Sequence, residues 1–184
     1  MVLAAGQDRG QDRGVLIRDC TEADLAATLT IYNALVPTTT IAWTEHPTTI
    51  EVWRGSFLDL RTRGYPVLVA VEPNGEYDGV VGVASYDDFR DTTHWEGYRF
   101  TVELSIHVRG DHRGAGIGRL LMEALVARAR AAGVHVMVAA IDAENVESLA
   151  FHTRLGFVEV ARMPEVGWKF GRWLDLVLVQ RVVS

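Results

Sequence analysis

The chain of 184 residues has a single cysteine, Cys20, so it cannot close an internal disulfide bond. Proteins without disulfides are typical of a reducing compartment, and we expect a cytoplasmic location. No apolar run approaches the roughly 18 residues of a membrane helix. Residues 1–14 also lack the apolar core of a secretory signal. The sequence therefore predicts neither membrane insertion nor export.

Positive charge is also scarce, with 18 basic residues against 24 acidic ones and a net charge of −6. This balance argues against general binding to nucleic acid or to an anionic membrane. No metal site is expected, because His-Glu-x-x-His is absent and the histidines are scattered. They are His46, His94, His107, His112, His135 and His152. A serine nucleophile is not supported either, because no Gly-x-Ser-x-Gly occurs.

The length fits one domain with a full core, and 48% of the residues are hydrophobic. Residues 1–14 repeat Gly-Gln-Asp-Arg-Gly and are polar and rich in glycine, which indicates a disordered extension. We expect residues 15–184 to form a single domain.

Periodicity and turn residues predict a mixture of strands and helices. We expect strands at 15–18, 67–71, 79–86, 101–108, 134–141, 157–162 and 174–182, and helices at about 21–34, 49–63, 115–132 and 145–155. Pro73-Asn74-Gly75 predicts a hairpin turn, and 36–47 and 87–98 predict loops. The first strands should form an antiparallel meander, and a later strand–helix–strand crossover should make the middle pair parallel. The expected class is α/β (α+β), with a mixed, mostly antiparallel sheet flanked by helices.

A glycine-rich turn separates the predicted strand at 101–108 from the amphipathic helix that follows it. It consists of Arg113, Gly114, Ala115, Gly116, Ile117 and Gly118. Such a turn exposes backbone N–H groups at the positive end of the helix dipole, where phosphate oxygens bind. The spacing fits neither a P-loop nor a Rossmann turn. By itself the pattern is also compatible with a tight turn that binds nothing.

Five ordered motifs resemble the GNAT superfamily of acyl-coenzyme A N-acyltransferases, and within it the phosphinothricin and methionine-sulfoximine acetyltransferases. The motifs are Thr101-Val102-Glu103, the turn at 113–118, Asn145 through Ser148, residues 151–157 and residues 166–175. The resemblance covers about residues 15–182. It implies a GNAT fold and transfer of an acetyl group from acetyl-CoA to the amino group of a small amino acid or analogue. Direct attack on the thioester is expected, because Cys20 is not placed as a nucleophile.

The resemblance also implies which residues bind acetyl-CoA. The backbone of Ile106, His107 and Val108 would pair with the pantetheine arm. The main-chain amides from Gly114 to Arg119, following Arg113, would hold the diphosphate. Asn145, assisted by Ser148, would bind the pantetheine or thioester region, although without the family context Asn145 is an ordinary helix N-cap.

Glu103 is the candidate general base, because an amine acceptor is mostly protonated at neutral pH and must lose a proton. It alternates with apolar neighbours and shares the polar face of its strand with Thr101, Ser105 and His107. The alternative is a solvated carboxylate on an exposed face. By resemblance His152 is a second acid/base group, and the alternative is a helix histidine bonded to a neighbour. The acid that protonates the leaving thiolate is left open.

The acceptor's carboxylate calls for a guanidinium or hydroxyl partner. Arg90 lies in the 87–98 loop with Trp95 and Tyr98, and by resemblance this loop, Trp43 and Glu103 form the acceptor pocket. The loop is about three residues longer than expected for the family, through an insertion at 91–93.

The motif at 166–175 predicts a hairpin between the last two strands. Its aromatic residues and the apolar final strand favour a homodimer, with a buried edge within the monomer as the alternative. Two other functions stay open. One is acetylation of a polyamine or a protein N-terminus, and the other is a non-catalytic acyl-CoA sensor.

Overall fold

The computed structural model describes residues 14–73 and 79–184. The predicted extension, apart from Gly14, and Asn74-Gly75 of the predicted turn lie outside these ranges. Across the described ranges, no helix is both long enough and apolar enough to span a membrane.

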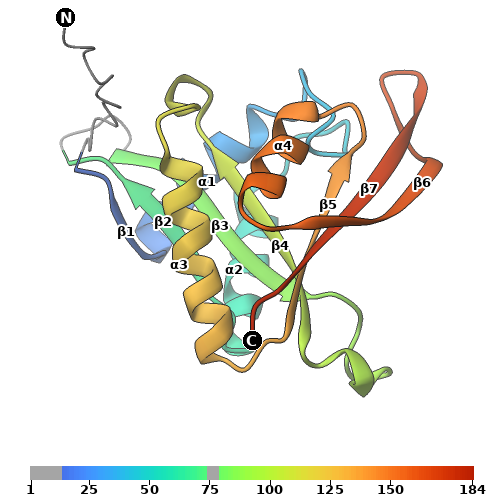
Figure 1. Cartoon of the computed structure of the whole chain (residues 1–184). Coiled ribbons are helices and arrows are strands. Elements are labelled where there is room, and N and C mark those ends of the chain that lie inside the picture. Colours follow the sequence, from blue (N-terminus) through green and yellow to red (C-terminus); the bar gives the residue numbers. More distant parts are fainter. Residues whose placement is uncertain (1–13, 74–78) are drawn as a thin grey trace, which may run out of the picture.

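Seven strands form one sheet in the order β1-β2-β3-β4-β5-β7-β6 (Figure 1). They are β1 Leu16–Asp19, β2 Val67–Val71, β3 Val80–Asp88, β4 Thr101–Val108, β5 Val136–Asp142, β6 Val158–Lys169 and β7 Arg172–Val182. Every neighbouring pair is antiparallel except β4 and β5, which are parallel. The predicted mixed sheet with a parallel central pair is therefore confirmed.

Helices cover both faces of the sheet. They are α1 Leu25–Asn33, α2 Ile50–Thr62, α3 Ile117–Ala131 and α4 Val146–Arg154. The apolar stripe of α3 packs on one face in the larger core, and the apolar side chains of α4 pack against the same core. On the opposite face, α1 and α2 close a second core with Val69, Val80 and Val83. Figure 1 shows α3 and α4 in front of the sheet and α2 behind it.

The last hairpin is longer than the sequence indicates. The predicted strands at 157–162 and 174–182 extend to Lys169 and back from Arg172, with Phe170 and Gly171 at the tip. The pairing of β6 with β7 shifts register between Met163 and Gly167, where Pro164 removes a backbone donor. A proline is tolerated because β6 is an edge strand, so the strand continues beyond the predicted end at 162.

Entry into α1 depends on a carboxylate–guanidinium pair. Asp24 accepts hydrogen bonds from the Thr21 backbone N–H at 2.7 Å and from both terminal nitrogens of Arg18 at 2.7 Å. These bonds lower the pKa of Asp24 to about 2, with the Arg18 bond as the largest cause. Asp24 is buried, so its charge is shielded from solvent.

Asp24→Asn is expected to lower the free energy of unfolding by about 2 kcal/mol at pH 7, the value of the pKa depression. Because the folded-state pKa is depressed, this stabilisation is present above the unfolded value and disappears as pH falls toward 2. Urea melts at several pH values would measure it. Asp19→Asn, which breaks an exposed pair with Arg128, is the control and should cost at most about 1 kcal/mol. Equal losses in the two variants would contradict the prediction.

Candidate active site

The central parallel pair separates almost as soon as it forms. β4 and β5 are paired only from Thr101 to Glu103 on β4 and from Val136 to Val138 on β5. On its other side, β4 stays paired with β3 as far as Val108. One edge of β4 beyond Glu103 therefore carries backbone donors and acceptors that β5 does not bind. In Figure 1 the two strands diverge toward α4.

Ile106, His107 and Val108 lie on this unpaired edge, where the sequence placed the pantetheine arm. An extended amide-bearing chain can pair with a free strand edge as another strand would. The sequence supplies the residues of β4, but the divergence from β5 is a property of the assembled sheet.

The glycine turn enters α3 with open amides. Gly114 and Gly116 have φ values of 76° and 84°, and Gly116 is the N-cap of α3. The amide of Leu120 bonds to the Gly116 carbonyl, whereas among the described residues nothing accepts from the amides of 114–119. A Cβ built on Gly114 or Gly116 would meet no atom within 4 Å. The turn thus offers N–H groups and free space, and both suit a diphosphate.

A polar network around the buried His112 anchors the start of this turn. His112 lies between two carboxylates, with Nδ1 at 2.7 Å from Asp111 and Nε2 at 3.1 Å from Glu72 of the segment after β2. Arg109 donates to Asp111 at 2.8 Å. These bonds tie the turn η4, Gly110–His112, to the neighbouring strand end before the glycines begin. No local pattern in the sequence indicates this role of His112.

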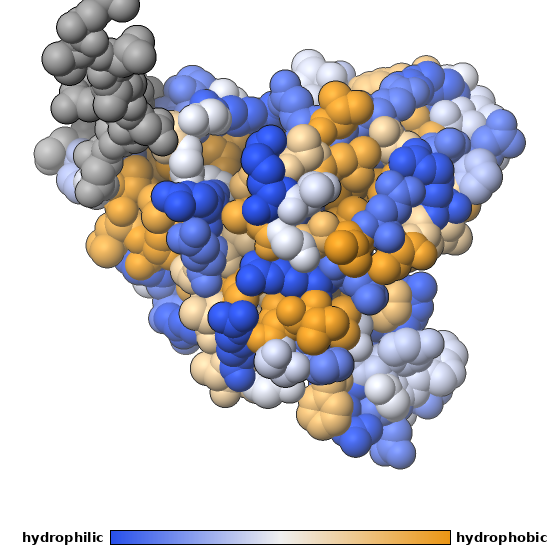
Figure 2. Space-filling view, in the orientation of Figure 1, coloured by the Kyte–Doolittle hydropathy of each residue, from blue (hydrophilic) through white to orange (hydrophobic). Residues whose placement is uncertain are grey.

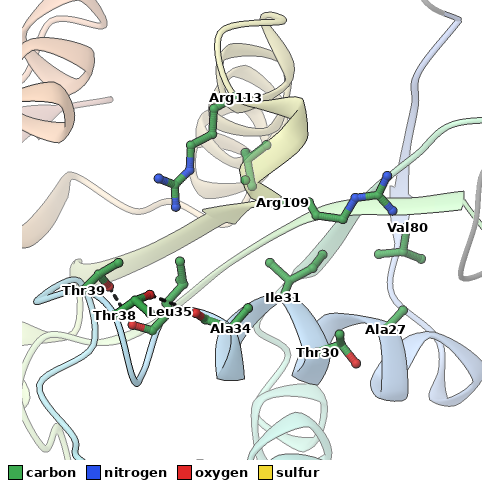
Figure 3. A pocket seen from close by; sticks show the side chains of 12 residues that line it. Ala27, Thr30, Ile31, Ala34, Leu35, Thr38, Thr39, Val80, Arg109 and Arg113 are labelled. Atoms are coloured by element: carbon green, nitrogen blue, oxygen red, sulfur yellow. Dashed lines mark hydrogen bonds between the residues drawn. The ribbon is translucent and has the colours of Figure 1, made fainter.

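A cavity of about 270 Å³ lies beside the turn. In Figure 3 Arg109 and Arg113 reach toward it from the loop that leads into α3, and Ala27, Thr30 and Ile31 of α1 line the opposite side. Thr38 and Thr39, from the connection after α1, complete the wall. The cavity therefore joins a basic edge to an apolar floor.

Glu103 faces the side of the sheet that carries α1 and α2. Its neighbours Val102 and Leu104 belong to the core under α3, so the alternation of the strand turns Glu103 the other way. Burial raises its pKa, Arg90 opposes the rise, and Asp87 adds to it. Asp87 lies directly opposite Glu103 in the β3–β4 register. A carboxyl with a raised pKa holds its proton more tightly than an ordinary glutamate, which favours a proton acceptor.

A second cavity, of about 220 Å³, lies along the same face of β4. Ser105 and His107 line it from the strand, and Tyr32, Trp53 and Phe57 line it from α1 and α2. Tyr32 stacks on Trp53 at 5.0 Å and meets the His107 ring edge-on at 5.5 Å. The cavity thus begins at Ser105, two residues after Glu103, and its aromatic wall also carries a hydroxyl and an imidazole group.

His107 contributes a side chain to this cavity as well as backbone to the β4 edge. Its Nε2 is 2.9 Å from the Ser105 hydroxyl, and its Nδ1 is a buried atom without a bonded partner among the described residues. Burial, with a smaller contribution from the charge of Arg113, lowers the pKa of His107 to about 4, so the ring is neutral at neutral pH. The aromatic wall was not predicted from the sequence, and His107 was predicted only to contribute its backbone.

α4 carries the other predicted polar residues. The Asn145 side chain accepts from the Ser148 amide at 3.0 Å, which is the N-cap geometry. His152 is buried, and its Nδ1–H donates to the Ser148 carbonyl at 2.9 Å. Its Nε2 is buried without a partner in the described part of the chain, and burial lowers its pKa. His152 therefore presents a neutral ring with one unused lone pair, enclosed by Phe151 and Phe157.

Besides Glu103, four residues are predicted to form the acceptor pocket, and each has different surroundings. Arg90 lies close enough to act on Glu103, and its guanidinium stacks on Phe89 at 4.4 Å. Trp43 instead packs on Gly167 of β6. Trp95 and Tyr98 lie on the projecting loop, 58% and 42% exposed. Within the inserted segment, Asp91 accepts hydrogen bonds from Thr93 and lies 2.8 Å from His94 Nδ1.

The match to known proteins agrees with this geometry. A family model described as "Acetyltransferase (GNAT) family" matches residues 28–157. The chain belongs to the GNAT acetyltransferase family. It is accordingly an N-acetyltransferase, as the five motifs indicate.

Relatives in this GNAT family are similar over nearly their whole length. An L-methionine sulfoximine/L-methionine sulfone acetyltransferase of Pseudomonas aeruginosa is 51% identical over 89% of this chain and 92% of its own. The L-amino acid N-acyltransferase MnaT of Escherichia coli is 46% identical, with 89% and 91% covered. A crystal structure of a phosphinothricin acetyltransferase from Sinorhizobium meliloti in complex with acetyl-CoA has a TM-score of 0.85 and 35% identity, covering 92% and 89%.

One further buried group of this GNAT enzyme was not singled out from the sequence. Asp142, the last residue of β5, receives a hydrogen bond from the Glu144 amide on Oδ1, while Oδ2 is buried without a described partner.

In the ranges that the structure describes, no three His, Cys, Asp or Glu side chains come together as a metal site.

Proposed function

We propose that this GNAT enzyme transfers the acetyl group of acetyl-CoA to the amino group of a small amino acid of the methionine sulfoximine or methionine sulfone type. The observation that supports it best is the separation of β4 from β5 directly after Glu103. A free strand edge, a turn of open amides and a half-buried carboxyl therefore follow one another along β4 and the turn after it. The acetyl-CoA thioester supplies the activated acyl group.

The chain's own residues would bind the donor in three places. The amides of 114–119 and the guanidinium of Arg113 would hold the diphosphate. The backbone of Ile106, His107 and Val108 would pair with the pantetheine arm. Asn145 keeps its amide nitrogen available while its oxygen caps α4. Ser148 lies in the same helix turn, with its hydroxyl 3.4 Å from His152 Nδ1.

Glu103 would take the proton of the incoming ammonium group, and the raised pKa of this carboxyl supports that role. Arg90 is the candidate partner of the acceptor's carboxylate, since it already acts electrostatically on Glu103. The aromatic cavity behind Ser105 would enclose the acceptor's side chain. Trp43 would shape the site from the loop between α1 and α2, and Trp95 and Tyr98 would border its outer rim. His152 would act as the second acid/base group through its free Nε2.

We also propose a homodimer. The final strand needs no partner, because β7 is covered within the chain by β5 and β6. The hairpin tip is different: Trp168, Phe170 and Trp173 are exposed, and Trp168 and Trp173 meet edge to face at 4.9 Å. Figure 2 shows apolar and charged side chains close together over this region. Sedimentation of the wild type and of a Trp168→Ser/Trp173→Ser variant tests the dimer, which the double variant should weaken.

Release of free thiol from acetyl-CoA tests the proposed activity across a panel of amines. The panel would contain L-methionine sulfone, L-methionine sulfoximine, phosphinothricin, spermidine and a peptide with a free N-terminus. We expect turnover of the amino acids alone, because Arg90 would bind the carboxylate of the acceptor. Turnover only on spermidine or the peptide would replace this acceptor with another amine. Acetyl-CoA binding with no turnover on any amine would make the protein a sensor.

A further inference from the structure

Lys169 is the only lysine of this chain, since the other 17 of its 18 basic residues are arginines. It stands at the end of β6, next to a hairpin tip whose other large side chains are exposed. Lysine is among the residues least often buried. Lys169 nevertheless has 0% of its surface exposed.

Its ammonium group is held in a cage of backbone oxygens. Nζ donates to the carbonyls of Val36 at 2.7 Å, Thr39 at 2.7 Å and Ala42 at 2.5 Å. An ammonium group has three N–H donors, so the cage uses all of them, and a neutral amine could satisfy only two. The Phe170 ring covers the group at 4.7 Å. Burial lowers the pKa of Lys169, and the nearby Glu45 opposes that shift.

The geometry explains why this position holds a lysine in an arginine-rich protein. Three carbonyls converge on one point, and a compact tetrahedral ammonium fits such a point. A planar guanidinium is larger and spreads its donors outward. Arginine at this position would keep the charge but would not match the cage.

The three carbonyls belong to the connection between α1 and α2, which has no regular secondary structure from 39 to 49. In Figure 1 this light-blue connection passes behind α4 toward the β6–β7 hairpin. Asn33 and Thr48 close its base through two hydrogen bonds of 2.9 Å. Between these ends the segment makes local hydrogen bonds, such as Thr39 N–H to the Leu35 carbonyl, and Lys169 ties its carbonyls at 36, 39 and 42 to β6.

A second contact joins the same two segments. The Trp43 ring lies on the backbone of Gly167, where a Cβ atom would overlap the ring. Thr39, whose carbonyl Lys169 binds, also lines the cavity opposite Arg113. The hairpin therefore contacts a residue that lines the cavity, through Lys169, and the ring of Trp43, through Gly167.

We propose that Lys169 is a positioning residue for the acceptor site, acting through the cage that holds residues 36–42 and, next to them, Trp43. The proposal rests on the proposed function, because it assumes that this loop contacts the acceptor. Lys169 itself touches no reacting atom. Its role is to keep the loop closed in the geometry that the acceptor needs.

Lys169→Met is expected to raise the acceptor KM about tenfold, because a displaced loop loses its contacts with the acceptor. The KM for acetyl-CoA and the kcat at saturating acceptor should change less than about threefold. Lys169→Arg should behave like Lys169→Met, since charge without the tetrahedral donors does not restore the cage. Val183→Ala is the matched control, because it removes buried apolar contacts far from this loop and should lower Tm without changing either KM.

Two results would overturn the proposal. One is an unchanged acceptor KM in both Lys169 variants, and the other is full rescue by Lys169→Arg. If the wild type turns over no amino acid, the proposed function fails, and the buried cage is then tested by the protection of Lys169 from methylation, which needs no acceptor.

Lys169 can be followed directly because it is the only lysine. Protein labelled with ¹³C at lysine Cε gives one resonance, and adding L-methionine sulfone together with coenzyme A should shift it, since the acceptor would act on the caged loop. Lysine-directed reductive methylation should leave Lys169 unmodified in the folded wild type, because the ammonium is buried and fully bonded. A resonance that ignores the acceptor, or rapid methylation of Lys169, would contradict the proposal even if Lys169→Met fails to fold.

Discussion

Glu103→Gln is expected to lower kcat/KM for the amino-acid acceptor by about 10²- to 10⁴-fold near neutral pH. The amide keeps the size and hydrogen-bonding capacity of the side chain but cannot accept a proton. The acceptor must then lose its proton to solvent before it reaches the thioester. The deficit should therefore shrink as pH rises toward the pKa of the acceptor's amine.

The dependence of the wild-type kcat/KM on pH should report the titration of Glu103. Burial and the neighbouring Asp87 raise the pKa of Glu103 against the opposing effect of Arg90. The acid limb of kcat/KM should therefore lie above the ordinary range of a glutamate, and the Gln variant should lack this limb.

The same substitution should not destabilise the fold. A raised pKa means that the folded protein holds the Glu103 proton more tightly than the unfolded chain. The free energy of unfolding therefore falls as pH rises from the unfolded-state pKa of Glu103 through its higher folded-state pKa. At pH 7 the ionised carboxyl destabilises the fold, and Glu103→Gln removes this destabilisation. We expect a Tm equal to or above that of the wild type.

Glu159→Gln, at an exposed strand position of β6, is the control and should match the wild type in both assays. An unchanged rate for Glu103→Gln at every pH would remove Glu103 from the mechanism. A large loss of Tm would instead assign it a structural role.

Gly116→Asn should raise the Kd for acetyl-CoA by about 10- to 100-fold, since each lost hydrogen bond to a charged group is worth about 1.5–3 kcal/mol. Gly116 has a φ of 84°, a conformation that asparagine tolerates better than other side-chain-bearing residues. Its side chain would occupy the open space in front of the amides of 114–119. Calorimetric titration of the donor measures the loss.

Gly133→Asn provides a closely matched control. Gly133 follows α3 with a φ of 75°, and a Cβ there also meets no atom within 4 Å. Both variants should lose a similar amount of stability, roughly 1 kcal/mol, for placing a side chain on a left-handed residue. Equal donor affinity in the two variants would show that the first turn of α3 does not hold the diphosphate.

Much of the fold was predictable because its signals are local. The glycines at 114 and 116, the amphipathic pattern of α3 and the alternation of β4 each depend on residues within a few positions of one another. The crossover between β4 and β5 predicted the parallel pair, and the sheet has it. The length of β6 was not predictable, because a proline at a bulge on an edge strand resembles a strand end in sequence.

The candidate site was predictable only in part. The positions of Glu103 and the glycine turn follow from one strand and the turn after it. The surroundings of Trp43, Trp95 and Tyr98 do not, because loop residues have no periodicity to indicate what they pack against. Packing placed Trp43 on Gly167 and left Trp95 exposed on the projecting loop.

The sequence by itself determined the family, the polar face of β4 and the amide turn that opens α3, since these depend on the order of residues along a short stretch of chain. Only the tertiary structure decided where β5 leaves β4, how Tyr32 and Trp53 enclose a cavity beside His107, and that Lys169 lies in a cage of carbonyls from a loop about 130 residues earlier. The physical reason is that these features exist only where distant segments pack together. Burial shifts the pKa values of Glu103 and His107, and it encloses the Lys169 ammonium among the carbonyls that it binds. Burial is a property of the assembled molecule.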